Sequence, residues 1–274
     1  MTNFEKPFNP DGAFRIFWDL LIILFIIYDL IMVPFEISFS TDTSKVIEII
    51  NYVVAACFIL DVVLTFNTGY YSKGMVVLER KKIARYYLKG WFWLDLITSF
   101  PYEIAGSNRD EISVLDVQQN LVAGIRALKF IRLIRVVRVL KLNIFIRKIE
   151  DYFQFEKIIN GLISLGKLFF EILFIAHFIA CLWHLIGSHP TEGQSWMISL
   201  GIQDAGIDER YVASFYWAIT TMITVGYGDI VPATRNERIF NVAVMITGCG
   251  VFAYTMNRVG SMLMDLDGGL SQQK

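Results

Sequence analysis

The run from Thr224 to Gly228 reads Thr-Val-Gly-Tyr-Gly and could bind a dehydrated cation through its own backbone. Consecutive carbonyl groups point to one side only where alternate residues adopt unusual φ values, and Gly226 and Gly228 do so at no steric cost. The hydroxyl of Thr224 can add an oxygen at the inner end. Rings of such oxygens replace the hydration shell of a potassium ion. The candidate cation-binding residues are Thr224, Val225, Gly226, Tyr227 and Gly228.

One such loop cannot close a ring, so the pattern predicts a homotetramer, or a heterotetramer with related subunits. The preceding segment Tyr211–Ile223 is too short to cross a membrane and is predicted to be a re-entrant pore helix. Its C-terminal end carries a partial negative charge that favours a cation. Tyr227 is expected to face away from the pore and to brace against Trp217 and Tyr216, and Asp229 completes the supporting set. An ordinary glycine turn would not need a half-length helix before it.

A second pattern consists of cations that recur at every third position and are separated only by apolar residues. They are Arg126, Lys129, Arg132, Arg135, Arg138 and Lys141. In an α-helix such steps drift slowly around the axis, whereas a 3₁₀-helix would align them on one face. One charge that crosses the membrane field is worth about 2.3 kcal/mol per 100 mV. The pattern therefore predicts a voltage-sensing helix, because a basic helix on the membrane surface would need a wider polar face.

Cations inside a membrane need acidic partners. Asp61 and Asp95 lie at intramembrane depth in two preceding apolar segments, and Phe58 precedes Asp61 by one turn on the same helix face. An aromatic plug beside an acid separates two aqueous crevices and concentrates the field. These three residues are predicted to form a charge-transfer site. A static ion pair between helices is the alternative, but it does not account for six cations.

The composition excludes several classes of protein. Hydrophobic residues make up 55% of the 274 residues and charged residues only 19%, and the mean hydropathy is +0.49, which is unlike a soluble domain. The high aromatic content of 15% excludes a disordered chain. The net charge of −1 gives no basic field for nucleic acid, so no nucleic-acid partner is expected. Three widely spaced cysteines do not form a disulfide framework.

The apolar runs predict an all-α membrane protein with six transmembrane helices and one re-entrant segment. The predicted spans are Ala13–Val33 (ending at Pro34), Val46–Phe66, Trp91–Phe100 (extended back through Tyr86–Leu88), Val114–Leu142, Leu162–Gly187 and Ile239–Met264. A boundary near Tyr152–Lys157 divides a four-helix voltage-sensor domain, 13–150, from a two-helix pore domain, 151–264. Residues 1–12 and 265–274 are predicted to be a cytoplasmic N-terminus and the start of a cytoplasmic linker.

Lysine and arginine concentrate in the loops after the second and fourth spans, which places these loops in the cytoplasm. The first and third loops are richer in acids and are expected outside. Both termini are therefore predicted to be cytoplasmic, and the plasma membrane with its lipids is the default environment.

Other chemistry-bearing residues give weaker predictions. Gly248 and Gly250 could form a gating hinge or equally allow close helix packing. Candidates for an inner constriction are Met256, Val259 and Met262. His177, Cys181 and His184 share one helix face, but no fourth ligand accompanies them, so no metal is expected beyond permeating K⁺. No catalytic constellation or cofactor motif is found, so the chain is not expected to be an enzyme.

The chain resembles the voltage-gated cation channel superfamily over nearly its whole length. It is most similar to the branch that carries cyclic-nucleotide-binding-type domains, namely ether-à-go-go, plant inward-type and hyperpolarisation-activated channels. The resemblance rests on FRIFWDLLIILFIIYDLIMVP at Phe14–Pro34, LDVVLTFNTGYYSKG at Leu60–Gly74, YLKGWFWLDLITSFPYE at Tyr87–Glu103 and TVGYGD at Thr224–Asp229.

This resemblance implies a voltage-gated, potassium-selective channel, with Asp61, Asp95 and Phe58 at the gating-charge transfer site. The short link from Lys141 to the fifth span implies that each sensor packs against the pore of its own subunit. A weakly selective, hyperpolarisation-activated cation channel is the alternative, although such animal channels usually lack both the Thr and the Asp of this motif. The family places a nucleotide-binding domain after the sixth helix, whereas this sequence ends at Lys274.

Two further classes remain as alternatives. A secondary transporter usually shows repeated halves with interrupted helices at matching positions, and this sequence has one interrupted segment. A silent or regulatory subunit would carry the same motifs but would need a partner to conduct. The sequence does not predict whether depolarisation or hyperpolarisation opens the pathway.

Overall fold

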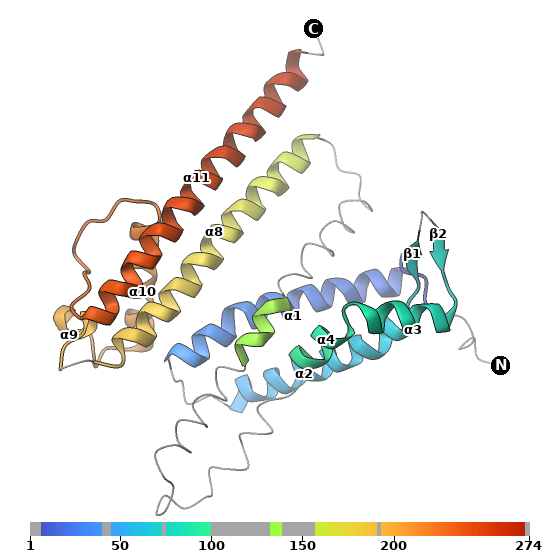
Figure 1. Cartoon of the computed structure of the whole chain (residues 1–274), viewed down its shortest axis with the longest axis horizontal. Helices are drawn as coiled ribbons and strands as arrows, with labels where there is room; N and C mark the ends of the chain where they lie inside the picture. Colours follow the sequence, from blue (N-terminus) through green and yellow to red (C-terminus); the bar gives the residue numbers. More distant parts are fainter. Residues whose placement is uncertain are drawn as a thin grey trace, which may run out of the picture. The chain divides into compact units, whose positions relative to one another are not determined.

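The computed structural model describes residues 7–39, 45–72, 75–99, 132–138, 157–190 and 193–271. The chain divides into two compact units (Figure 1). The first unit comprises Met1–Val33 and Thr41–Ile149, and the second comprises Pro34–Ser40 and Glu150–Lys274. Four of the described helices are long and apolar enough to cross a membrane: Ala13–Phe39, Lys45–Phe66, Gly161–Gly187 and Arg235–Met264.

The first unit is built from helices with one small hairpin. Its elements are α1 (Ala13–Phe39, as far as Val33), α2 (Lys45–Phe66), β1 (Tyr70–Ser72), β2 (Met75–Val77), α3 (Arg80–Lys89), α4 (Phe92–Ser99) and the 3₁₀-helix η1 (Arg132–Arg138). α2 packs against α3 and α4, and η1 packs against α4. The predicted fourth span, Val114–Leu142, lies outside the described residues except for η1.

The third apolar run differs from the prediction. Instead of one helix that continues from Tyr86 to Phe100, the chain forms α3 and α4 with a turn at Gly90 and Trp91. The N–H of Gly90 closes the end of α3 on the carbonyl of Tyr87, at 3.0 Å. Glycine is a common helix terminator, so this break has a local cause. Residue 100 lies outside the described residues.

A two-stranded antiparallel hairpin joins α2 to α3, and the all-α prediction did not include it. Tyr70 pairs with Val77 and Ser72 with Met75. A side chain at Gly69 would lie 2.9 Å from the carbonyl of Val77, so only glycine fits this corner. The N-terminal segment joins there, because the backbone of Phe8 exchanges hydrogen bonds with the α2–β1 turn.

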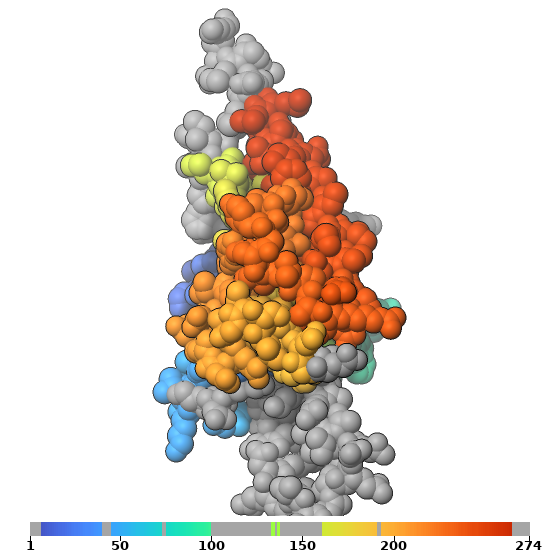
Figure 2. Space-filling view, turned by 90° about the vertical axis from the view of Figure 1, so that its left-hand side faces the viewer, coloured from blue at the N-terminus to red at the C-terminus, as the bar shows by residue number. Residues whose placement is uncertain are grey.

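The second unit consists of α8 (Lys157–Gly187), α9 (Trp196–Leu200), α10 (Ile207–Met222) and α11 (Arg235–Ser271), together with the end of α1. α8, α10 and α11 pack against one another. The rings of Trp183 and Trp217 stack in the core with centroids 3.7 Å apart. Figure 2 shows one side of the molecule, where residues from α9 through α11 (gold to red) form much of the visible surface.

α1 does not stop at Pro34 as predicted but continues to Phe39. Proline removes one backbone hydrogen bond, which long membrane helices tolerate where neighbouring groups compensate. The last residues of α1 pack within the second unit, where Phe39 stacks on His184 with ring centroids 3.7 Å apart. His184 Nδ1 lies 3.1 Å from the carbonyl oxygen of Ser38, whose hydroxyl donates to the carbonyl of Cys181.

Gly248 and Gly250 of α11 differ in their surroundings. A side chain at Gly248 would lie 2.9 Å from the Cα of Met222 in α10, whereas one at Gly250 would meet nothing within 4 Å. Of the two alternatives for Gly248, close packing therefore has structural support. The constriction candidates lie further along α11, where Met256 is exposed and Val259 and Met262 are half-buried.

Candidate functional site

The loop after α10 has an alternating backbone. Thr224, Gly226 and Gly228 have φ values of 62°, 55° and 78°, whereas Val225 and Tyr227 have none in the positive range. Such alternation turns successive carbonyl groups toward the same side. The two glycines behave as the sequence predicts. A positive φ was not expected at Thr224, because this conformation is strained for a β-branched residue. Within the described ranges, Thr224 is the one non-glycine residue that has a positive φ.

The end of α10 holds the inner part of this loop. The N–H groups of Val225 and Gly226 both donate to the carbonyl of Thr220, at 2.9 and 3.1 Å, and the N–H of Thr224 donates to Thr221. These bonds use N–H groups of the loop and leave its carbonyl oxygens available. The strained conformation at Thr224 is therefore maintained by bonds to a regular helix.

The outer part of the loop is supported by Tyr216. Its hydroxyl donates to the carboxylate of Asp229, and this bond holds the pKa of Asp229 below its usual value. Its ring lies nearly parallel to that of Tyr227, with an angle of 4° between the ring planes and 6.5 Å between the ring centroids. Trp217 is buried in the core and stacks on Trp183, and its predicted contact with Tyr227 stays a prediction.

The Tyr216–Asp229 bond predicts a pH effect. A lowered carboxyl pKa contributes stability above the ordinary aspartate pKa, and this contribution is lost as the pH falls through the lowered value. Tyr216→Phe should therefore melt below the wild type at neutral pH, and the difference should narrow on acidification. Thermal unfolding at several pH values measures this. Tyr254→Phe is the control, and an equal narrowing there would contradict the assignment.

Glu237 holds the outer loop from the other side and was missed at the level of sequence. Its buried carboxylate accepts the N–H groups of Trp196, Ala233 and Thr234, at 3.1, 2.7 and 3.0 Å. It thereby ties α9 and the segment after Asp229 to the start of α11. The sequence did contain a signal for this role of Glu237, because Thr234-x-x-Glu237 is a capping box.

Glu237→Ala should lower the free energy of unfolding by about 3 kcal/mol, since one buried and two half-buried N–H groups would lose their acceptor. Denaturant unfolding of the purified protein measures the change. Glu209→Ala, which removes an exposed glutamate of the same unit, should stay within about 0.5 kcal/mol of the wild type. Equal losses in the two variants would contradict the role of Glu237.

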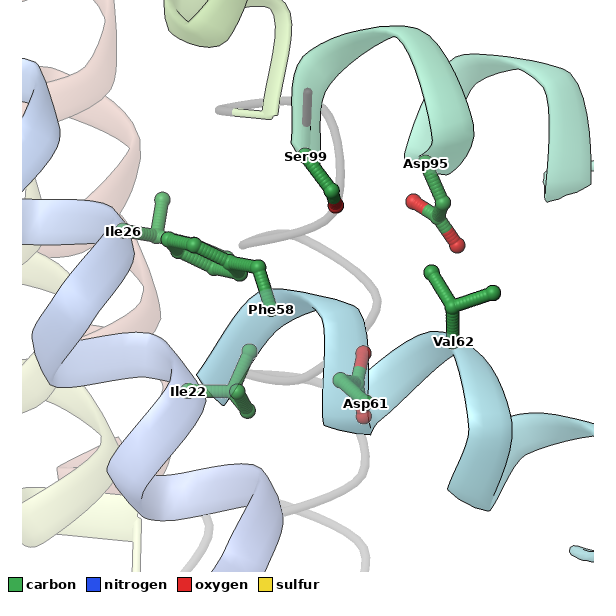
Figure 3. Close-up of a pocket in the computed structure, with 7 residues that line it drawn as sticks. All are labelled: Ile22, Ile26, Phe58, Asp61, Val62, Asp95 and Ser99. Atoms are coloured by element: carbon green, nitrogen blue, oxygen red, sulfur yellow. The ribbon is translucent and has the colours of Figure 1, made fainter. Parts of the chain in front are cut away.

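The first unit brings together the three predicted transfer-site residues. Phe58 and Asp61 of α2 and Asp95 of α4 are all buried, and Figure 3 shows them around one small cavity. Its lining consists of Ile22, Ile26, Phe58, Asp61, Val62, Asp95 and Ser99. The volume of about 10 Å³ accommodates at most one water molecule.

Three partners of these acids were not predicted from the sequence. Oδ1 of Asp61 lies 3.0 Å from Nη2 of Arg15 and 3.1 Å from Nε1 of Trp18. Nε of Arg15 also contacts Asp19, at 2.8 Å. The hydroxyl of Tyr87 donates to Asp95 at 2.6 Å. Arg15 and Asp19, spaced i and i+4 in an apolar helix, could have signalled such a cluster.

The charged segment forms a 3₁₀-helix where the structure describes it. Arg132, Arg135 and Arg138 lie within η1, and the open choice between an α-helix and a 3₁₀-helix is therefore decided for this stretch. Residues three apart are eclipsed along a 3₁₀-helix. η1 packs against α4, which carries Asp95. Arg126, Lys129 and Lys141 lie outside the described residues.

The histidines of α8 pack against other groups. Nδ1 of His177 lies 2.9 Å from the hydroxyl of Tyr211, and His184 contacts Ser38 and Phe39. Among the residues that the structure describes, no three His, Cys, Asp or Glu side chains are grouped as metal ligands.

Comparisons with known proteins give a consistent result. A family model described as "Ion transport protein" matches residues 15–264. The chain is 29% identical to the mouse voltage-gated inwardly rectifying potassium channel KCNH7 over 95% of its length and 23% of that protein. It is 30% identical to the human voltage-gated delayed rectifier potassium channel KCNH5, over 93% of this chain and 27% of that protein. The potassium voltage-gated channel unc-103 of Caenorhabditis elegans is 29% identical, over 95% of this chain and 33% of that protein. This chain spans about a quarter to a third of the length of these relatives.

Proposed function

The chain belongs to the ion transport protein family, and we propose that it is the membrane part of a voltage-gated, potassium-selective channel. Membership of this family agrees with the prediction that the chain is not an enzyme. The observation that carries the proposal is the alternation of positive φ at Thr224, Gly226 and Gly228. The matching relatives are named as voltage-gated potassium channels.

In this proposal four chains place their 224–228 loops around one axis, and K⁺ passes down its gradient between rings of carbonyl oxygens. Thr220 and Thr221 hold the inner end of each loop, and Tyr216, Asp229 and Glu237 hold the outer end. Rigid support on both sides preserves a spacing that fits K⁺. The remaining parts of the pathway, including a constriction at Met256, Val259 and Met262, are proposed on sequence grounds.

Voltage sensing would use the first unit. The arginine-rich segment supplies the charges, and the small cavity between Phe58, Asp61 and Asp95 supplies a narrow site that they pass one at a time. About three charges per subunit over four subunits would bring tens of kcal/mol to bear on the gate at resting potentials. The 3₁₀ form of η1 supports this role, because consecutive charges would then follow one path.

The proposed membrane arrangement follows the loop charges. The chain would cross the plasma membrane six times with both termini in the cytoplasm. Apart from Pro34–Ser40, which belongs to the second unit, the compact units divide between Ile149 and Glu150. We propose residues 13–150 as the voltage sensor and residues 151–264 as the pore domain.

Current recording from oocytes that express this chain tests the function. Voltage steps in both directions should evoke a current whose reversal potential follows the K⁺ gradient when external K⁺ is varied. A reversal potential that follows Na⁺ equally would favour the weakly selective alternative. Absence of current and of charge movement in a chain that reaches the surface would contradict the proposal.

A further inference from the structure

α3 presents a cationic face that the proposed function does not use. At 100° per residue, Lys81, Lys82, Arg85 and Lys89 lie within an arc of about 100°, and all four are exposed. The opposite face packs into the first unit through Ile83 and Tyr87, which are only 2% and 5% exposed. The helix is therefore attached by its apolar side and directs a band of positive charge outward.

Most of this charge is not neutralised by nearby acids. Lys82 pairs with Glu79 at 2.8 Å. Within the parts of the chain that the structure describes, no ion pair involves Lys81, Arg85 or Lys89. Three neighbouring cations on one short helix repel one another, so an anionic partner would reduce this electrostatic repulsion.

Exposed aromatic residues beside this face favour a position at the depth of lipid headgroups. Tyr86 is 58% exposed at the edge of the cationic face, and Trp91 and Trp93 follow directly, with Trp93 61% exposed. Tryptophan and tyrosine prefer the membrane–water interface. The loop containing α3 is also the basic loop that the sequence places in the cytoplasm, where the leaflet carries anionic lipids.

The buried side of α3 connects to the candidate sensor. The hydroxyl of Tyr87 donates to Oδ2 of Asp95 at 2.6 Å, and its ring packs edge-on against Phe66 and Phe92, with centroids 4.9 and 5.7 Å away. One helix thus carries the cationic face on one side and a direct bond to a transfer-site carboxylate on the other. A displacement of α3 would move the Tyr87 hydroxyl relative to Asp95.

We propose that the cationic face of α3 binds the headgroups of anionic phospholipids of the cytoplasmic leaflet, and that Tyr87 transmits this binding to Asp95. The lipid-binding part rests on the exposed cations of α3, on the aromatic residues beside them and on the predicted cytoplasmic position of this loop, whereas the effect on gating rests on the proposed channel function. Lys81, Arg85 and Lys89 are the binding residues, and Tyr87 is a positioning residue.

Lipid retention tests the binding step without requiring current. The full chain is purified from vesicles of phosphatidylcholine and phosphatidylserine, and the phosphatidylserine retained per subunit is measured by mass spectrometry. The combined variant K81Q/R85Q/K89Q should lower the affinity for phosphatidylserine at least tenfold. Each cation near an anionic surface raises the binding constant about fivefold before screening by salt. The charge-preserving variant K81R/K89R should retain lipid as the wild type does. Equal retention by the combined Gln variant would overturn the proposal.

Recordings in planar bilayers test the coupling. Adding phosphatidylserine to the cytoplasmic leaflet should shift the voltage of half-maximal opening of the wild type. The shift should be lost in K81Q/R85Q/K89Q and retained in K81R/K89R. Tyr87→Phe should retain lipid normally yet lose most of the shift, which a purely structural role would not produce. A full voltage shift in Tyr87→Phe would overturn the coupling. Absence of all current would count against the channel function, whereas the lipid-retention experiment would still test lipid binding.

Discussion

Gly226→Ala should reduce the K⁺ current more than a hundredfold while the protein still assembles and reaches the membrane. Gly226 has a φ of 55°, and an added Cβ would meet nothing within 4 Å of the chain. The effect therefore comes from backbone conformation and not from lack of space. A left-handed conformation costs a non-glycine residue about 1–2 kcal/mol, and a tetramer would bear this cost four times around one ring. Whole-cell current normalised to surface protein measures the result.

Gly201→Ala is the matched control for this experiment. Gly201 has a φ of 75°, also has open space around its Cα, and caps the end of α9 away from the 224–228 loop. The local strain is similar, but no carbonyl ring depends on it. We expect a small loss of stability and a preserved reversal potential. Equal loss of current in both variants would mean that positive φ matters only for folding and would contradict the assignment of the ring.

Asp61→Asn should cost about 3–5 kcal/mol of stability in the first unit, because it breaks a buried ion pair and leaves Arg15 with reduced compensation. The double variant Arg15→Gln/Asp61→Asn should lose less than the sum of the two single variants, with a coupling of about 2 kcal/mol. Chemical unfolding of the purified wild type, the two single variants and the double variant gives the four free energies of unfolding that this comparison needs. Asp11→Asn changes an exposed carboxylate of the same unit and keeps an oxygen that can accept the hydroxyl of Tyr71, so it should have little effect.

Arg15 should also influence the voltage at which charge moves. Arg15→Gln removes the resident cation from Asp61, which then attracts the mobile arginines toward the proposed cytoplasmic end. Charge movement should therefore shift to more depolarised potentials. A tenfold change in the underlying equilibrium corresponds to about 20 mV for three moving charges. Gating-current recordings measure the shift, and an unchanged charge–voltage relation would show that Arg15 is only structural.

Local backbone chemistry explains why parts of the site were predictable. Gly226 and Gly228 are short-range signals, since glycine alone adopts positive φ freely, and both have the predicted conformation. The apolar lengths of α2 and α8 follow from hydropathy, and their bounds lie close to the predicted spans. Phe58 and Asp61 share a helix face by periodicity alone. Each of these predictions depends on residues within a few turns of one another.

Errors occurred where neighbours override local preference. Pro34 was expected to end the first span, but α1 continues through it and the following residues pack around His184. Thr224 has a positive φ because Thr220 and Thr221 bind the loop backbone.

The sequence by itself determined that this chain is a membrane protein with two loop glycines suited to positive φ and a periodic series of charges, because hydropathy, glycine and spacing act through the chain itself. Only the tertiary structure decided which groups meet across the fold. Arg15 reaches Asp61 over 46 positions, and Glu237 reaches Trp196 over 41. No periodicity encodes such pairs, since burial and hydrogen bonding select them only when the helices have packed.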